Sequence, residues 1–146
     1  MSEHKATIAW RMDDGEFTYE TYPRDHEIRV EKLTIPASSA PEFKGNPDHM
    51  DPEQGLVAAI SSCHMLTFLA ICAKKKIGVR SYTDEAVGVL EANEEKKLAV
   101  TRVTLHPRVE FDGPAPDAET LEKLHDSAHR NCFIANSVKC EVTVAS

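Results

Sequence analysis

The longest apolar stretch of the chain runs from Asp51 to Lys76, and the other predicted elements are arranged around it. Asp51 suits an N-cap, Pro52 suits the first helical position, and Gln54 stands where it would close a capping box. Apolar residues fall on nearly every side of the helix that follows. We therefore predict a long central helix that a sheet or a second subunit covers on most sides.

Alternation of apolar and polar residues predicts strands before this helix. Residues 7–12 alternate, and a second alternating run carries Phe17 and Tyr19 after the turn residues 13–15. These two runs predict a hairpin.

A third strand is predicted at residues 26–30. If its pleat extends backwards, Arg24 lies on the inward side and Arg29 points to water. The next segment, residues 35–50, is rich in Pro, Ser and Ala and predicts an irregular loop.

After the central helix the pattern predicts two more strands, at residues 79–90 and 98–111, which form a long antiparallel hairpin around a polar turn. Asp117 then suits the N-cap of a second helix that runs to about Asn131. Residues 138–144 alternate again and predict the last strand. The predicted order is therefore strands, long helix, hairpin, shorter helix and strand.

Length and composition indicate one globular domain over residues 1–146, with 41% hydrophobic and 28% charged residues. A net charge of −7 argues against nucleic acid as a partner, and the basic run Lys74–Lys76 suits a helix end. The amino terminus has no secretory pattern, so we expect a cytoplasmic protein. Five polar residues interrupt the apolar run Leu56–Ala73, which favours a buried helix over a membrane span.

The four cysteines fall into two classes. Cys140 shares the apolar side of the last strand, and Cys72 lies on the side of the long helix opposite Cys63, so both are predicted to be inert. Cys63 and Cys132 each stand among polar residues, although either one taken singly is explained more simply as structural. As a pair they suggest a peroxidatic thiol and a resolving thiol.

A reactive Cys63 needs a nearby cation, because it lies too far from the helix amino terminus to gain from the dipole. Arg24 is the first candidate and Arg29 the second, and Glu53 could orient the guanidinium. Ten residues of helix place Glu53 about 15 Å from Cys63. Either the arginine spans this distance, the helix breaks near Gly55, or Glu53 serves a second subunit. The simpler explanations are a solvated Arg24 and a Glu53 that complements the first helical turn.

A metal site competes with this interpretation. His125, His129 and Cys132 fall on one face of the second helix, a spacing that suits zinc, with Cys63 or His64 as the fourth ligand. The helix would have to continue through Cys132, and a second tight ligand pair is missing from the sequence.

The segment DPEQGLVAAISSCHMLTFLA, followed about seventy residues after its cysteine by AHRNCFIANSVK, resembles the two cysteine motifs of the OsmC/Ohr family. This family comprises the osmotically inducible and organic hydroperoxide resistance proteins. The order of elements is similar as well, over nearly the whole chain. The resemblance implies an α+β fold in which antiparallel sheets wrap around a long central helix, and an intertwined homodimer.

The resemblance also implies thiol-dependent reduction of organic or inorganic hydroperoxides in oxidative stress defence, without a cofactor or a metal. By motif, Cys63 corresponds to the peroxidatic cysteine, Cys132 to the resolving cysteine with which it forms a disulfide, and Glu53 to the carboxylate that orients an arginine. Arg24 is assigned from position alone, since the Gly-Gly pair of the Ohr branch is missing. The residues after both cysteines are more similar to the broader OsmC-like branch.

We therefore expect a cytoplasmic homodimeric peroxidase whose partners are a hydroperoxide substrate and an external thiol reductant such as a dihydrolipoyl protein, with no nucleic acid or membrane partner. Two alternatives stay open. One is a zinc-binding module that uses His125, His129 and Cys132. The other is a non-catalytic dimeric binding protein with thiols that never cycle.

Overall fold

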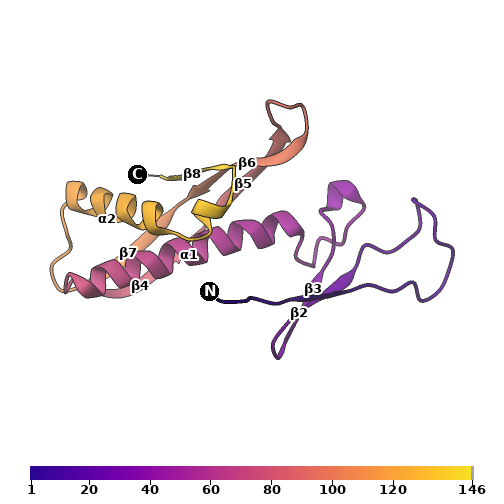
Figure 1. Cartoon of the computed structure of the whole chain (residues 1–146), viewed down its shortest axis with the longest axis horizontal. Helices are drawn as coiled ribbons and strands as arrows, with labels where there is room; N and C mark the ends of the chain where they lie inside the picture. The colour runs from indigo at the N-terminus through magenta and orange to yellow at the C-terminus, as the bar shows by residue number, and fades with distance from the viewer. Residues whose placement is uncertain (146) are drawn as a thin grey trace. The chain divides into compact units, whose positions relative to one another are not determined.

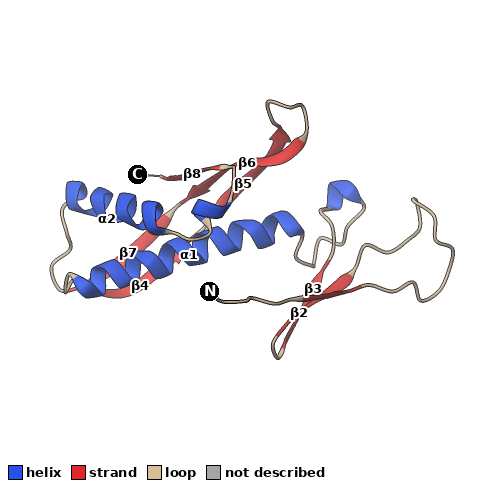
Figure 2. Cartoon of the chain, in the orientation of Figure 1, coloured by secondary structure: helices blue, strands red, loops and turns tan. Residues whose placement is uncertain are grey.

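The computed structural model describes residues 1–145, which form a mixed α+β structure of α-helices and small sheets (Figures 1 and 2). Internal contacts divide the chain into two compact units, Met1–Gly55 and the residues from Leu56 onward. Each unit is described by itself, and the expectation of one domain over residues 1–146 stays a prediction.

The first unit contains a three-stranded antiparallel sheet in the order β1-β2-β3. The strands are Thr7–Ala9, His26–Val30 and Leu33–Ala37. β2 is the strand predicted at residues 26–30, and its side chains alternate between half-buried and exposed as the pattern requires.

The predicted hairpin between residues 7–12 and the run through Phe17 is wrong, because β1 pairs with β2 instead. The intervening segment is a loop whose aromatic side chains pack on one another. Trp10 meets Phe17 edge to face at 5.9 Å between ring centroids and Tyr22 at 6.2 Å. This clustering, rather than a ladder of strand pairs, explains the alternation of large side chains in the sequence.

The predicted loop at residues 35–50 begins later than expected, since β3 extends to Ala37 and includes Pro36. β3 lies at the edge of its sheet, where a residue without a backbone N–H is tolerated. A 3₁₀ turn, η1, follows at Pro41–Phe43.

The long helix α1 spans Pro52–Lys74 and begins as the sequence predicts. The backbone N–H of Asp51 donates to Gln54 Oε1 at 2.9 Å, and the Gln54 N–H donates to Asp51 Oδ1 at 2.8 Å, which completes the capping box. The helix ends at Lys74, within the basic run that suits a helix end. Lys76 takes the left-handed conformation with φ of 59°, and Gly78 already belongs to the next strand.

In the second unit the predicted long hairpin is interrupted. β4 (Gly78–Asp84) pairs with β7 (Pro107–Asp112), and β5 (Val87–Ala92) pairs with β6 (Leu98–Leu105). Asp84 occupies the interruption: it accepts the backbone N–H of His106 at 2.6 Å and the hydroxyl of Ser61 on α1. Both predicted strands therefore exist, but each is split between two sheets.

The second helix, α2, spans Ala118–Asn131, and Asp117 caps it by accepting the Thr120 N–H at 2.7 Å. A 3₁₀ turn, η2, follows at Ala135–Ser137. The last strand, β8, is Glu141–Val144, shorter than predicted, and it pairs with β6 in parallel. The predicted α+β fold with antiparallel sheets is confirmed, and the pairing of β6 with β8 is its one parallel pairing among the described strands.

One side of α1 forms the core of the second unit. Towards the sheet of β5, β6 and β8 it contributes Ile60 to a buried cluster, and towards α2 it contributes Phe68 and Cys72 to another. α1 and α2 lie side by side in Figure 1. Cys72 is 1% exposed, and burial raises the pKa of its thiol, as expected for an inert cysteine.

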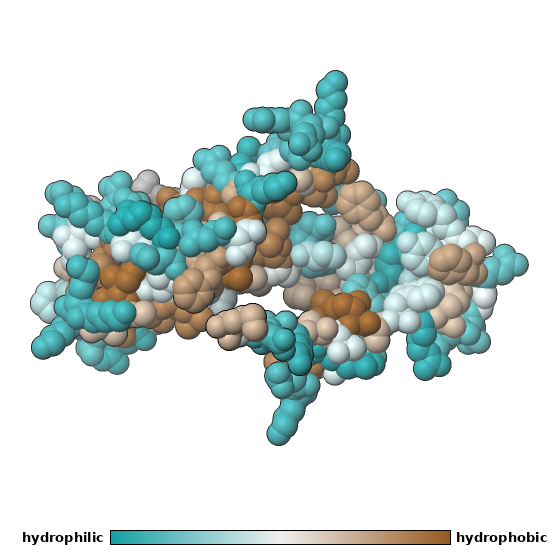
Figure 3. Space-filling model, in the orientation of Figure 1, coloured by the Kyte–Doolittle hydropathy of each residue, from teal (hydrophilic) through white to brown (hydrophobic). Residues whose placement is uncertain are grey.

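The opposite side of α1 is exposed in the single chain. Its exposed residues, spaced by three or four positions, make up an apolar face that is defined by Ala59, Ser62, Leu66, Ala70 and Ala73. Hydrophobic side chains reach the surface along this part of the molecule in Figure 3. By length and composition α1 could cross a membrane, and 22% of its most apolar stretch is buried in the chain. One chain therefore covers less of the helix than the sequence predicts.

Candidate functional site

Cys63 and Cys132 meet in the second unit, although 69 positions separate them in the sequence. Cys63 lies in the middle of α1, and Cys132 is the residue at which α2 ends. The Cys132 thiol is within hydrogen-bonding reach of the Cys63 sulfur. Cys132 is 1% exposed, Cys63 is half-buried, and both thiols are free. The predicted pair is therefore brought together, with Cys63 as its more accessible member.

The backbone after α2 folds tightly around this pair. Cys132 leaves the helix with φ of −76° and ψ of 115°, and its carbonyl then accepts the N–H of Asn136 at 3.0 Å. The N–H of Ala135 donates to the Cys132 sulfur at 3.4 Å. Between these residues, the amides of Phe133 and Ile134 lie close enough to the Cys63 sulfur to lower its pKa. A short turn thus surrounds both sulfur atoms with N–H donors.

These donors separate the acidities of the two thiols. Burial acts to raise the pKa of Cys63, but hydrogen bonds from the Ile134 amide, the Cys132 thiol, the Phe133 amide and Thr67 outweigh it, so the pKa lies below its ordinary value. Burial raises the pKa of Cys132, and its interaction with Cys63 adds to the rise. Cys63 is therefore the more acidic thiol of the pair, and Cys132 is the less acidic one.

The sequence did not reveal these amide donors, because backbone groups leave no residue-type pattern. The expectation that Cys63 needs a cation therefore missed the contribution of the turn. The signal that was available is the position of Cys132 at a predicted helix end, since the amides of the residues that follow do not belong to the helix.

Arg24 lies in the first unit, on the half-buried side of its segment as predicted. Arg29 is exposed, and its Nε lies 3.6 Å from Oε2 of Glu27. The Arg24 guanidinium donates to the carbonyl of Tyr22 at 2.6 Å and to that of Tyr19 at 2.7 Å. Its Cζ lies 3.6 Å from the centroid of the Tyr22 ring. The guanidinium is thereby held by its own aromatic loop.

Arg24 lines a cavity of about 430 Å³ whose other walls are aromatic and small polar side chains. The remaining lining residues are Trp10, Phe17, Tyr22, Pro23, His26, Ser38, Ser39 and Pro52. A cationic group above apolar walls suits a ligand with a polar end and an apolar body.

Glu53 lies in the first turn of α1 with a half-buried side chain, where a carboxylate complements the helix dipole. Arg24 and Glu53 belong to the first unit, and Cys63 and Cys132 belong to the second. The roles assigned to Arg24 and Glu53 towards Cys63 stay predictions.

The sequence profile of OsmC-like proteins matches residues 45–146, which include both cysteines. The chain belongs to the OsmC-like protein family. A search among curated proteins gave no match.

Solved structures agree with this membership. An OsmC-like protein of unknown function from Vibrio cholerae is 46% identical, with a TM-score of 0.94 and 99% of each chain covered. An organic hydroperoxide resistance protein OsmC from Legionella pneumophila has a TM-score of 0.74 at 18% identity, over 100% of this chain and 98% of that one. The organic hydroperoxide resistance protein OhrB of Bacillus subtilis has a TM-score of 0.71 at 16% identity, over 98% and 96%. The last two likenesses show that the fold is shared.

The geometry does not support a zinc site in this OsmC-like chain. α2 ends at Asn131, before Cys132, and Nδ1 of His125 is 3.0 Å from His64 Nε2. Among the described residues, 1–145, no three His, Cys, Asp or Glu side chains converge as metal ligands would.

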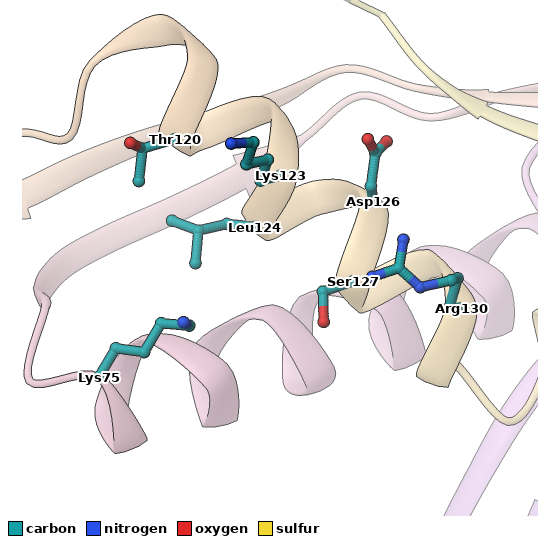
Figure 4. A pocket seen from close by; sticks show the side chains of 7 residues that line it. All are labelled: Lys75, Thr120, Lys123, Leu124, Asp126, Ser127 and Arg130. Carbon is teal, nitrogen blue, oxygen red and sulfur yellow. The ribbon is translucent and has the colours of Figure 1, made fainter.

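A separate cavity of about 380 Å³ lies between the end of α1 and α2 of this OsmC-like chain (Figure 4). Leu124 and Ser127 point from α2 towards α1, and Lys75 extends along α1 below them. The lining includes neither Cys63 nor Cys132, so this cavity is distinct from the thiol pair.

Proposed function

We propose that this OsmC-like protein is a cytoplasmic thiol-dependent peroxidase that reduces organic hydroperoxides in oxidative stress defence. The observation that carries the proposal is the hydrogen-bonded pair of Cys63, with its lowered pKa, and Cys132. Relatives of the same fold that are named organic hydroperoxide resistance proteins support the choice of substrate class.

The first step is attack of the Cys63 thiolate on one oxygen of the hydroperoxide. A sulfur–oxygen bond forms, the O–O bond breaks, and the departing alkoxide takes up a proton to leave as an alcohol. Cys63 becomes a sulfenic acid. The amides of Phe133 and Ile134 favour the thiolate that starts this step.

The second step joins the two cysteines. The sulfur of Cys132 attacks the sulfenic sulfur of Cys63, a disulfide forms, and the sulfenic hydroxyl leaves as water together with the proton of the Cys132 thiol. An external dithiol, such as a dihydrolipoyl protein, then exchanges with the disulfide and restores both thiols at the expense of its own oxidation. No cofactor is needed in this scheme.

Arg24 and Glu53 are assigned to the substrate side of the reaction. The cavity beside Arg24 has apolar walls that suit the alkyl part of a hydroperoxide and a guanidinium that suits its oxygens or the thiolate. Glu53 would orient this guanidinium through charge-assisted hydrogen bonds.

We further propose that the working form is a homodimer in which a second copy covers the exposed apolar face of α1. Leu66 in this face is 60% exposed, and Phe133, which follows Cys132, is 79% exposed. A long helix with this much exposed apolar surface is unusual for a monomer, and a second copy of the same face would bury it. Sedimentation of the purified protein measures the expected dimer.

The function is tested by following hydroperoxide consumption with dithiol in excess. We expect Cys63→Ser to abolish consumption and Cys132→Ser to support one round of oxidation. After one equivalent of an organic hydroperoxide, mass spectrometry of the natural protein should show a loss of two hydrogens at the Cys63–Cys132 peptide pair.

The matched control is Cys72→Ser, since Cys72 is a free thiol on the same helix, in the core next to α2. This variant should retain turnover if it folds. Full turnover by Cys63→Ser would exclude the proposed mechanism, and thiols that stay reduced would favour a non-catalytic binding protein.

A further inference from the structure

His64 and His125 form a buried pair that joins the helix carrying Cys63 to the helix ending at Cys132. His64 Nε2 and His125 Nδ1 are 3.0 Å apart, and the two rings are nearly parallel, at 9°. The two residues are 1% and 7% exposed. Phe68 stacks on His125 with 4.4 Å between ring centroids. Burying two imidazoles costs more free energy than burying apolar side chains of similar size. A buried histidine pair therefore suggests a function beyond filling the core.

The hydrogen-bond partners indicate which nitrogen atoms carry hydrogen. Nδ1 of His64 is buried and has no partner within residues 1–145. A buried N–H without an acceptor is disfavoured more strongly than an unused lone pair. Nε2 of His64 therefore carries the hydrogen and donates it to Nδ1 of His125. The bond has one favoured direction and joins two neutral rings.

This bond differs in kind from the other contacts between α1 and α2. The rest of the shared core consists of apolar groups such as Phe68, Cys72 and Leu124. Apolar contacts are non-directional and tolerate small shifts, whereas a hydrogen bond weakens steeply when its angle or length changes. The histidine pair therefore fixes the position of one helix along and around the other.

The two histidines stand close to the cysteines along their own helices. His64 directly follows Cys63, and His125 precedes Cys132 by seven residues, which is about two helical turns. A shift of one residue moves a helical position by about 1.5 Å along the axis and about 100° around it. A disulfide requires Cβ atoms within about 4.5 Å of one another, so such a shift would separate the thiols.

We propose that the His64–His125 hydrogen bond is a positioning contact that holds Cys63 and Cys132 at the separation from which their disulfide forms. The inference rests on the proposed function, since it concerns the second step of that cycle. Both histidines act through the helices and not on the reacting atoms, because the imidazoles hydrogen-bond to each other.

The test measures disulfide formation without peroxide, in mixtures of oxidised and reduced glutathione. Oxidised glutathione accepts two electrons and two protons from Cys63 and Cys132, and two glutathione thiols are released. The fraction of Cys63–Cys132 disulfide is read by mass spectrometry. We expect His125→Leu to lower the equilibrium constant for this disulfide roughly fivefold, which corresponds to the loss of one hydrogen bond.

Two conservative variants should keep the disulfide equilibrium constant of the natural protein. His125→Asn places an amide oxygen near the position of Nδ1 and keeps the acceptor, and His64→Gln places an amide N–H near Nε2 and keeps the donor. If His125→Leu does not fold, His125→Asn is compared with His125→Gln, whose longer side chain moves the acceptor away. The proposal is supported if His125→Asn keeps the equilibrium constant of the disulfide and His125→Gln lowers it.

Leu124→Ala serves as the matched control, because it opens a cavity beside His125 and leaves the hydrogen bond in place. It should lower the free energy of unfolding and leave the disulfide equilibrium unchanged. Equal constants in the natural protein and His125→Leu, or an equal loss in Leu124→Ala, would overturn the inference. A protein that forms the disulfide but consumes no peroxide would contradict the proposed function and leave this inference standing.

Discussion

The Cys132 thiol lies within hydrogen-bonding reach of the Cys63 sulfur as its donor, and this interaction makes the two cysteines differ in acidity. The donor is itself buried, and its own pKa is raised. The same interaction therefore favours the thiolate of Cys63 and the protonated thiol of Cys132.

The contact predicts how the acidity of Cys63 responds to substitution. Cys132→Ala removes a donor to the thiolate and should raise the pKa of Cys63. Cys132→Ser keeps a donor and should have the smaller effect. The rate of alkylation of Cys63 by iodoacetamide, measured against pH, gives the midpoint of thiolate formation, which is the pKa of Cys63. An unchanged midpoint in Cys132→Ala would show that the amides alone determine it.

The buried histidines predict a loss of stability in mild acid. Burial, with repulsion from His125 and His129, lowers the pKa of His64 to about 4, although the charge of Asp84 acts in the opposite direction. An imidazole in the unfolded chain titrates near pH 6.5, so between these values the unfolded state binds more protons. Stability should therefore fall as the pH decreases from about 6.5 to about 4, by up to about 1.4 kcal/mol per pH unit for this one group.

Urea unfolding of the natural protein and of His64→Gln at several pH values isolates this contribution. Asp84, Asp126, His129 and Tyr82 surround the pair and are present in both proteins, so the two proteins differ only at position 64. The difference between the two proteins should be constant above about pH 7 and should change between pH 6.5 and 4. A difference that is flat over the whole range would contradict the prediction.

The helix α1 packs so closely on β5 at Gly88 that there is no room for a side chain at this position. A Cβ atom at this position would lie 2.5 Å from Cγ2 of Val57 on α1, and the stiff valine side chain has little freedom to move. Gly88→Ala should therefore lower the free energy of unfolding by about 1 to 3 kcal/mol. Denaturant unfolding measures the change.

Gly55 provides the matched control for this substitution. It lies in the first turns of α1, and its added Cβ would meet the end of Met50 at an ordinary 3.5 Å. Gly55→Ala should be neutral or stabilise by up to about 1 kcal/mol, because alanine favours the helix. Equal destabilisation by both substitutions would mean that the distance to Val57 is not the cause.

The parts of the fold that the sequence predicts correctly are those with local causes. Asp51 with Gln54, and Asp117 with Thr120, determine where the helices begin through bonds between residues three positions apart. The positions of Cys63 and Cys72 on opposite sides of α1 follow from helical geometry alone.

The parts that the sequence predicts incorrectly depend on partners far away in the chain. The alternation before residue 20 gives no sign that β1 pairs with β2, because the same large side chains serve an aromatic cluster. The strand interruption at Asp84 depends on His106 and Ser61, which bind it from other elements. The amides that face Cys63 depend on the turn after α2 and leave no pattern in the side chains.

The turn at residues 133–137 has a consequence for the protein during its synthesis. Cys63 is translated well before Phe133 and Ile134, so an unfinished chain on the ribosome contains this cysteine without the amides and without the Cys132 thiol. Its sulfur is then an ordinary protonated thiol at neutral pH. We expect nascent chains to react slowly with peroxide and to avoid premature oxidation, so that reactivity arises only once the chain has folded past α2.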